Sequence, residues 1–367
     1  MRSQKALPVR ILIKAILFVV LFSLAFSLLI NLPIGKISLY NYLYPGRERF
    51  PFGENPAASY NLSIYNLDAM MASHEISAAE KAADEYRVFV VGDSSAWGFL
   101  QHPQDTLAGL LDSRRLQLDG KQVRVYSLGY PSLSVLKDLL IIDRARHYQP
   151  DLIIWLVTLE SLPLDKQLET PLVANNPLAV NDLINRYQLS GFAKQSIDWR
   201  EATLFARRRE MADIIRLQIY GVMWAATGID QDYPNDYTPA LRDFEMDESF
   251  YDFTLHELDA KRLALDVIDQ TIKVNDDIRF LVINEPILIA AGENSDIRYN
   301  YYYPRWTYDH YRVLMQANLD KNGINYYDLW NIVPQEHFTN SAIHMDISGE
   351  EILAERIASI IIETVAQ

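Results

Sequence analysis

A serine and a histidine at distant points of the chain stand where hydrolytic chemistry could occur. Ser94 ends the run Val90-Val91-Gly92-Asp93-Ser94, directly after an apolar stretch that is typical of a buried strand. His344 lies in a loop just ahead of the last helical pattern. A hydroxyl beside an imidazole base is an arrangement that turns a weak nucleophile into a reactive one. We therefore expect Ser94 to act as a nucleophile and His344 as its base.

Each residue also has a simpler interpretation. Gly, Asp and Ser are common in turns that end a strand, and the chain contains seven histidines. The prediction depends on both residues lying at the same edge of one sheet.

Short apolar runs alternate with helical patterns, which predicts a parallel sheet covered by helices on both faces. The predicted strands are 87–91, 123–127, 152–157, 280–284 and 324–329, and the predicted helices include 106–118, 133–148 and 347–365. Asp105 is the expected N-cap of the first helix, and Ser348 to Glu351 reads as a capping box in the last. We expect an α/β, flavodoxin-like three-layer sandwich with a parallel five-stranded sheet, whose carboxyl edge binds ligands.

A long insertion separates the third and fourth predicted strands, at about residues 161–277. Helical patterns at 199–226 and 258–274 within it predict a helical cap over the carboxyl edge of the sheet. The domain with its insertion is expected to occupy residues 87–367, preceded by a connector at 37–86.

The first 36 residues contain five basic residues and no acidic one. Since the total charge is -14, the rest of the chain carries -19. Ala15 to Gly35 contains no charged residue and would span about 31 Å as a helix, close to the thickness of a bilayer core. We expect residues 1–36 to form a cytoplasmic tip and a transmembrane anchor. Most of the basic residues precede the span, so the main domain is expected outside the cytoplasm, as in a single-pass membrane protein.

Two other interpretations of this segment remain. A cleaved signal peptide would need a shorter apolar core and a small-x-small cleavage site, and the end of the segment offers no convincing one. A buried soluble helix would account for a segment that is apolar all round.

Composition excludes several classes of function. The chain has no cysteine, which rules out a disulfide scaffold, thiolate metal sites and a cysteine nucleophile. A net charge of -14 argues against a nucleic-acid partner. We expect no metal site and no cofactor.

Four sequence blocks together resemble the SGNH (GDSL-type) hydrolase superfamily. They are Gly92 to Ser95, Ser127 to Ser132, Pro150 to Glu160 and Ser341 to His344. The resemblance covers residues 87–160 and 278–366 and leaves out the insertion. It implies Ser94 as the nucleophile, His344 as the base, and an oxyanion hole that includes the backbone N–H groups of Ser94 and Ser132.

The sequence departs from this pattern at three positions. Ser132 replaces a glycine, which still leaves a backbone donor. Glu160 replaces an oxyanion-hole asparagine, and an ionised carboxylate there would repel an oxyanion. Ser341 replaces the aspartate that orients the histidine, so Asn340, Ser341, a main-chain carbonyl or a repacked Asp346 would have to substitute.

An anchor followed by an extracytoplasmic domain of this type resembles the layout of envelope acylation proteins. The expected function is serine-dependent ester hydrolysis or acyl transfer on a cell-envelope glycan or lipid. The alternative is a catalytically degenerate envelope protein that binds a glycan or a membrane acyltransferase. In both cases the expected partners are the membrane, an envelope glycan or acyl donor, and an acyltransferase.

Overall fold

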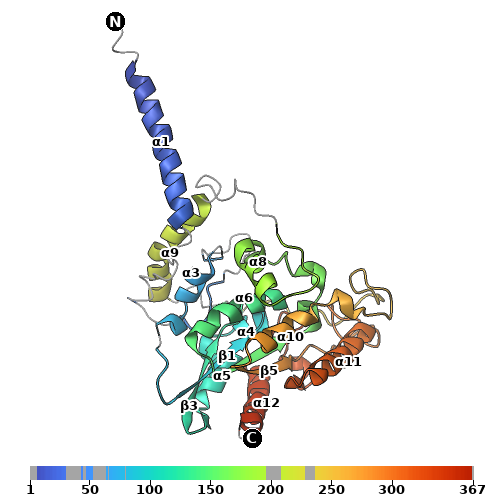
Figure 1. Cartoon of the computed structure of the whole chain (residues 1–367). Coiled ribbons are helices and arrows are strands. Elements are labelled where there is room, and N and C mark those ends of the chain that lie inside the picture. The colour runs from blue at the N-terminus through green and yellow to red at the C-terminus, as the bar shows by residue number, and fades with distance from the viewer. Residues whose placement is uncertain are drawn as a thin grey trace.

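One six-stranded sheet forms the centre of the molecule (Figure 1). A computed structural model of the chain describes residues 6–29, 43, 47–52, 63–64, 66–78, 80–195, 208–227 and 236–365. The strand order is β2-β3-β1-β4-β5-β6, and the bounds are β1 (Glu85–Val91), β2 (Gln117–Leu118), β3 (Lys121–Ser127), β4 (Leu152–Val157), β5 (Arg279–Asn284) and β6 (Tyr326–Asp328). All pairs are parallel except β2–β3. Because the parallel strands follow the flavodoxin-like order, the predicted fold class is confirmed.

The sixth strand, β2, is absent from the sequence prediction. The helix predicted at 106–118 ends early, as α5 (Leu107–Ser113), and its N-cap is Thr106, whose Oγ1 accepts the Gly109 N–H at 3.3 Å. The chain then turns back at Asp119 and Gly120, which have φ values of 52° and 73°. Two central residues with positive φ favour a two-residue hairpin turn, so the last predicted helical residues pair with β3 instead.

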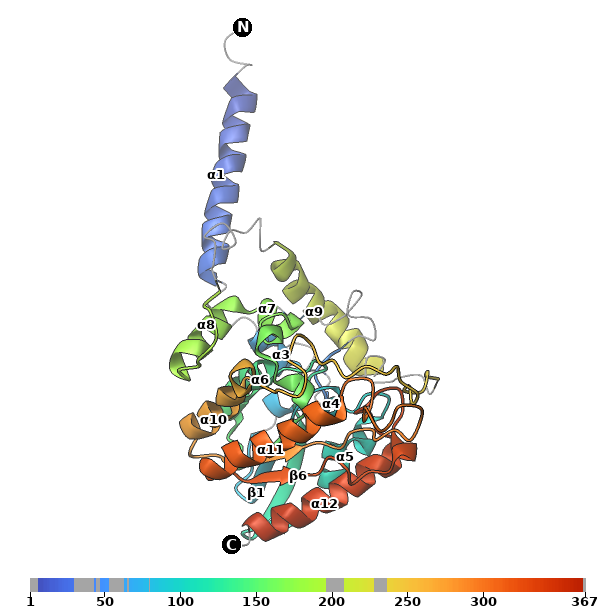
Figure 2. The same cartoon turned by 90° about the vertical axis from the view of Figure 1, so that its right-hand side faces the viewer.

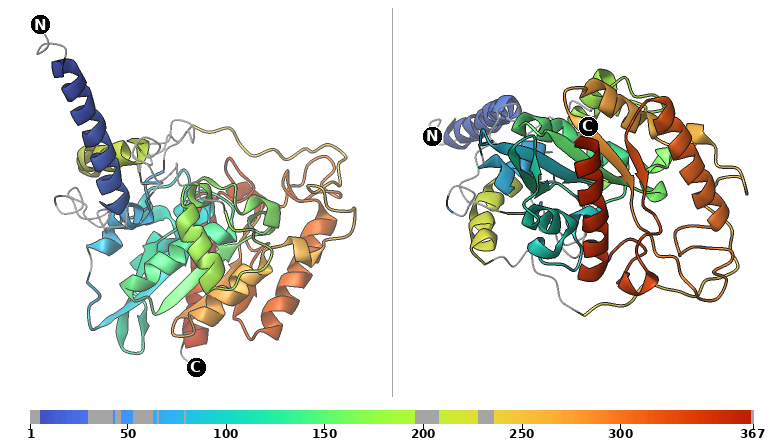
Figure 3. Two further views of the ribbon diagram at one scale, coloured as in Figure 1. Left: turned by 45° about the horizontal axis from the view of Figure 1, so that its top comes forward. Right: turned by 90° about the horizontal axis from the view of Figure 1, so that it is seen from below.

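Helices cover both faces of the sheet, and the side chains of β1 alternate between two cores. Val88 and Val90 pack with α5 and α12 (Ile347–Val365), whereas Phe89 and Val91 face α6 (Val135–Ala145) and α10 (Leu265–Val274). Figure 3 shows α12 lying across one side of the sheet. This two-residue period is the geometry of a strand buried on both faces.

The last helix begins one residue earlier than the predicted capping box. α12 starts at Ile347, and Asp346 Oδ1 accepts the Gly349 N–H at 2.9 Å. Aspartate is as good an N-cap as serine, so Asp346, and not Ser348, caps the helix. The cap fixes the loop that carries His344 directly ahead of a rigid element.

The insertion is helical only in part. It contains α7 (Pro171–Ala174), α8 (Pro177–Arg186), α9 (Arg208–Thr227) and α10, but residues 236–259 form no helix. The helix predicted at 258–274 therefore begins seven residues late, at Leu265, and residues 199–207 of the other predicted helix lie outside the described part. The coil segment still reaches the site, because Ala240 N donates to Thr339 O at 2.8 Å.

An apolar helix projects from the domain at the N-terminus, α1 (Ala6–Leu29) (Figures 1 and 2). Within it, Pro8–Ala25 has a mean hydropathy of 2.2 with no part buried. By length and composition, α1 could cross a membrane, and it is the one such helix among the described residues. It begins before the predicted Ala15, and residues 30–35 of the predicted span lie outside the described part.

Parts of the predicted connector contribute to the core. Phe50, Met70 and Ile76 are buried in the same cluster as the helices that cover one face of the sheet. α3 (Leu67–Ala72) packs on α6. These segments therefore pack with the domain, and the boundary at residue 86 stays a prediction.

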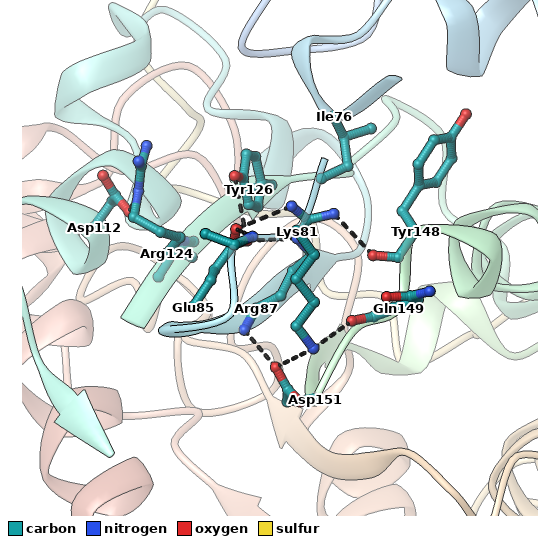
Figure 4. A network of polar contacts seen from close by, with 12 residues as sticks. Ile76, Lys81, Glu85, Arg87, Asp112, Arg124, Tyr126, Tyr148, Gln149 and Asp151 are labelled. Atoms are coloured by element: carbon teal, nitrogen blue, oxygen red, sulfur yellow. Dashed lines mark hydrogen bonds and ion pairs between the residues drawn. The ribbon is translucent and has the colours of Figure 1, made fainter. Parts of the chain in front are cut away.

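A buried arginine ties the amino ends of two strands together (Figure 4). The Arg87 guanidinium donates to the Glu85 carboxylate and, at 2.9 Å, to Tyr148 O. Its backbone N–H donates to Asp151 Oδ2 at 2.6 Å, and Lys81 Nζ lies 2.7 Å from the same oxygen. The network therefore fixes the start of β1 against the segment that enters β4.

Replacing Arg87 with methionine is expected to lower the free energy of unfolding by about 3–5 kcal/mol, because it leaves the buried Glu85 carboxylate without its partner. The matched control is Arg124→Met, whose side chain is 51% exposed in its pair with Asp112 and should cost below about 1 kcal/mol. Urea denaturation of the full chain in detergent measures both values. Equal losses in the two variants would contradict the structural role of Arg87.

Candidate active site

Ser94 stands at the first position of a one-turn helix at the carboxyl end of β1. The helix is α4 (Ser94–Trp97), and Asp93 caps it by accepting the Ser95 N–H at 2.8 Å. Gly98 ends it with a φ of 78°, a conformation that L side chains rarely adopt. Ser94 is therefore held by turns on both sides and not by a mobile loop.

The structure brings His344 to Ser94. His344 Nε2 lies 2.6 Å from Ser94 Oγ, and Nδ1 lies 2.8 Å from Asn340 Oδ1. An amide oxygen can only accept a hydrogen bond, so Nδ1 carries the proton and Nε2 presents a lone pair to the serine hydroxyl. The Phe99 ring stacks on the imidazole with centroids 4.8 Å apart. These contacts fix both the tautomer and the plane of the ring.

Burial determines the charge state of this imidazole. His344 is 9% exposed, and burial lowers the pKa of His344 to about 3. The ring is therefore neutral at physiological pH, with an unprotonated Nε2 facing the Ser94 hydroxyl. The same burial makes the imidazolium that forms on proton transfer costly.

Asn340 occupies the place of the orienting acid, one residue before the position that the family pattern indicates. Ser341 Oγ lies 3.0 Å from Tyr301 OH. Asp346 Oδ2 lies 3.2 Å from His337 Nδ1. Of the substitutes that the sequence left open, the structure selects the Asn340 side chain.

The backbone donor expected at Ser132 is already engaged. Ser132 N donates to Tyr130 O at 2.7 Å, so its N–H does not point into an empty oxyanion hole. The Ser132 hydroxyl, in contrast, is buried with no hydrogen-bond partner among the described residues. Lys137 Nζ donates to Tyr130 O at 3.0 Å and to Gly92 O at 2.6 Å, which fixes this turn beside the start of α4.

The carboxylate of Glu160 is buried and has hydrogen-bond partners. Its carboxylate accepts hydrogen bonds from Lys166 Nζ and Tyr251 OH. Its backbone N–H donates to Tyr303 OH at 3.1 Å. The negative charge that would oppose an oxyanion is thus paired with the Lys166 ammonium.

Sequence reasoning missed Glu285, which directly follows β5. Ser95 Oγ donates to Glu285 Oε2, and the glutamate is 1% exposed. Burial raises the pKa of Glu285 well above its usual range, and the neighbouring Asp93 raises it further. The sequence signal that could have identified Glu285 is its place directly after a buried strand, because ligands of such sheets bind at the carboxyl ends of the strands. Glu285 holds α4, and with it Ser94, against the end of β5.

Within the described ranges, no group of three His, Cys, Asp or Glu side chains is arranged to hold a metal ion. The polar groups at this edge serve hydrogen bonding: His344 with Ser94 and Asn340, and Glu160 with Lys166.

No family model matches this chain, and no curated protein matches it. Among solved structures, it is similar to a carbohydrate acetylesterase family member from Sinorhizobium meliloti, with 9% identity over 77% of this chain and 99% of that chain and a TM-score of 0.36. It is also similar to the aryl esterase of M. smegmatis, with 12% identity over 76% and 98% of the two chains and a TM-score of 0.35. A member of the lipolytic protein G-D-S-L family from Veillonella parvula DSM 2008 has 9% identity over 75% and 97%, with a TM-score of 0.35.

The buried imidazole makes the stability of the fold depend on pH. The unfolded chain binds a proton at His344 near pH 6.5, whereas the folded chain binds it only near the pKa of about 3. Stability should therefore fall as the pH decreases from about 6.5, by up to about 1.4 kcal/mol per pH unit from this group. His344→Gln should make the decline between pH 6.5 and 5 shallower by up to about 2 kcal/mol.

Urea denaturation of the full chain at several pH values measures this difference. His147→Gln, which removes an exposed imidazole, is the control and should follow the wild-type curve. If the His344→Gln curve also follows the wild type, His344 is not buried as described.

Proposed function

We propose that this chain is a membrane-anchored SGNH-type enzyme that performs serine-dependent ester hydrolysis or acyl transfer on a cell-envelope glycan or lipid. The observation that carries the proposal is the relay from Ser94 Oγ to His344 Nε2 and from His344 Nδ1 to Asn340 Oδ1, at 2.6 and 2.8 Å. These distances lie within or at the edge of the range for a nucleophile, its base and the group that orients the base.

The reaction proceeds in two steps. Ser94 Oγ attacks the ester carbonyl carbon while His344 Nε2 takes the hydroxyl proton, and a tetrahedral oxyanion forms. Collapse of this intermediate leaves the acyl group on Ser94, and His344 returns the proton to the departing alcohol. Water or a glycan hydroxyl then attacks the acyl-serine by the same route, which gives hydrolysis or transfer.

We expect the donors for the oxyanion at the start of α4 and in the neighbouring turn. The Ser94 N–H is at the positive end of the helix. The buried Ser132 hydroxyl, which lacks a partner among the described residues, is a better candidate than the Ser132 N–H. A second donor that is preorganised in a buried site stabilises the charge that develops in the transition state.

The location of the substrate follows from the anchor. The Pro8–Ala25 part of α1 is apolar and none of it is buried, so a bilayer is the environment that would cover it. With its N-terminus in the cytoplasm, the domain would face the envelope. Substrates there are surface polymers, lipids or acyl groups delivered by a membrane acyltransferase.

A catalytically degenerate binding protein is the second candidate, and a specific observation favours it. His344 has a neutral amide behind it where a carboxylate would stabilise the imidazolium, and loss of that carboxylate can cost several orders of magnitude in rate. Such a protein would use the same edge of the sheet to bind a glycan or an acyltransferase without turnover.

A fluorophosphonate probe distinguishes the two candidates, because it labels only an activated serine. The wild-type chain is expected to be labelled, and both Ser94→Ala and His344→Ala should lose the label. Ser113→Ala, which removes an exposed serine remote from the relay, should be labelled as the wild type is. Absence of label from a folded wild-type chain would leave the binding protein as the better account.

Replacing Asn340 with aspartate places a carboxylate where the amide oxygen now lies. A charged acceptor stabilises the imidazolium, so kcat/KM for an aryl acetate should rise by about 10- to 100-fold. Ser341→Asp is the matched control, because position 341 faces Tyr301 and not the imidazole. An equal gain in the two variants, or none in Asn340→Asp, contradicts the assignment of Asn340.

The proposed orientation is tested by a reporter fused after Gln367. A reporter that is active only outside the cytoplasm should be active, because the basic residues precede the apolar span. Activity of a reporter that works only in the cytoplasm would overturn the orientation and the envelope substrate together.

A further inference from the structure

Helix α9 packs on the domain through one of its sides. Leu217 is 2% exposed and contacts Ala69 of α3, with Val222 packed against the same small cluster. This contact fixes which side of α9 faces outward.

An apolar stripe lies on the outward side of α9, next to the exposed Arg216. Ile215, Ile219 and Met223 are 55%, 61% and 57% exposed, and their spacing of four residues places them on one face of the helix. A surface helix of a soluble domain normally shows polar side chains on its outer face. The exposed stripe therefore differs from the outer face that a helix normally presents to water.

The place of α9 in the molecule indicates what covers this stripe. In Figures 1 and 2, one end of α9 lies near the C-terminal end of α1, on the side of the domain from which α1 projects. If α1 spans a bilayer, its domain end lies at the lipid headgroups. An element near that end is then within reach of the headgroup layer.

The charge of α9 fits the same environment. Its sequence contains three arginines, Arg208, Arg209 and Arg216, against Glu210 and Asp213. The helix therefore has a net charge of +1, whereas the chain beyond the first 36 residues carries -19. Helices with arginine or lysine beside an apolar stripe bind at the boundary of headgroups and acyl chains.

We propose that α9 is a second membrane contact, with its Ile215–Ile219–Met223 face inserted among the lipids beside α1. This inference rests on the membrane anchoring within the proposed function and not on the hydrolytic chemistry. A single anchor leaves the domain free to rotate about the membrane normal and to tilt. A second contact on α9 restricts both motions and holds the domain in one orientation above the surface.

The absence of cysteine from the chain allows a direct test with single thiols. The variants Ile219→Cys and Ile215→Cys are made in the full chain, labelled with an environment-sensitive nitrobenzoxadiazole dye and reconstituted into vesicles of phosphatidylcholine and phosphatidylglycerol. Addition of nitroxide-labelled lipid is expected to reduce the fluorescence about twofold at both positions, because a stripe inserted at the acyl boundary is in contact with the quencher.

Two further positions serve as controls. Val313→Cys lies on α11 (Arg305–Lys321) and is 69% exposed, so it should be quenched by aqueous iodide and not by the lipid quencher. Leu17→Cys lies within α1 and should be quenched by the lipid.

Each other outcome overturns the inference for an identifiable reason. If dyes at positions 219 and 215 are quenched by iodide and not by lipid, while the dye at position 17 is quenched by lipid, then α1 is in the membrane and α9 is in water. If neither quencher reaches 219 and 215, protein and not lipid covers the stripe. If 17 is not quenched by lipid, the membrane anchoring itself fails. None of these readouts depends on turnover at Ser94.

Discussion

The hydrogen bond between Ser94 and His344 joins residues 250 positions apart, and it exists because of a constraint on parallel strands. β1, β4 and β5 run in the same direction, so the segments that follow their carboxyl ends meet at one edge of the sheet. α4 begins there, and the loop ahead of α12 returns there. Aspartate caps at both helix starts, Asp93 and Asp346, then hold the two side chains in place.

The site has well-defined hydrogen bonds but no unpaired charge beside His344 among the groups described above. Asn340 sets the tautomer of His344 but brings no charge, and burial keeps the ring neutral. Glu160 brings a charge, but Lys166 neutralises it. The side chain behind His344 is therefore a neutral amide and not a carboxylate.

Local patterns predicted the elements whose signal is local. The buried strands appear as continuous apolar runs because parallel strands are covered on both faces. The turn at Asp119 and Gly120 was also readable, yet the helical pattern before it hid β2, because a two-residue strand has no period of its own. The coil at 236–259 escaped prediction for a similar reason, since its place is set by contacts such as that of Ala240 with Thr339.

The sequence by itself determined that Ser94 and His344 would stand at the same edge of the sheet, because strands that alternate with helices run parallel and end at one edge. It could not determine what lies behind His344. The choice of Asn340 over Ser341 depends on Tyr301, which comes from another loop. The pairing of Glu160 with Lys166 and Tyr251, and the contact of Ser95 with Glu285, likewise join segments that are distant in the sequence. Tertiary structure decided these contacts, because the partner of a buried polar group is whichever group packing brings within reach.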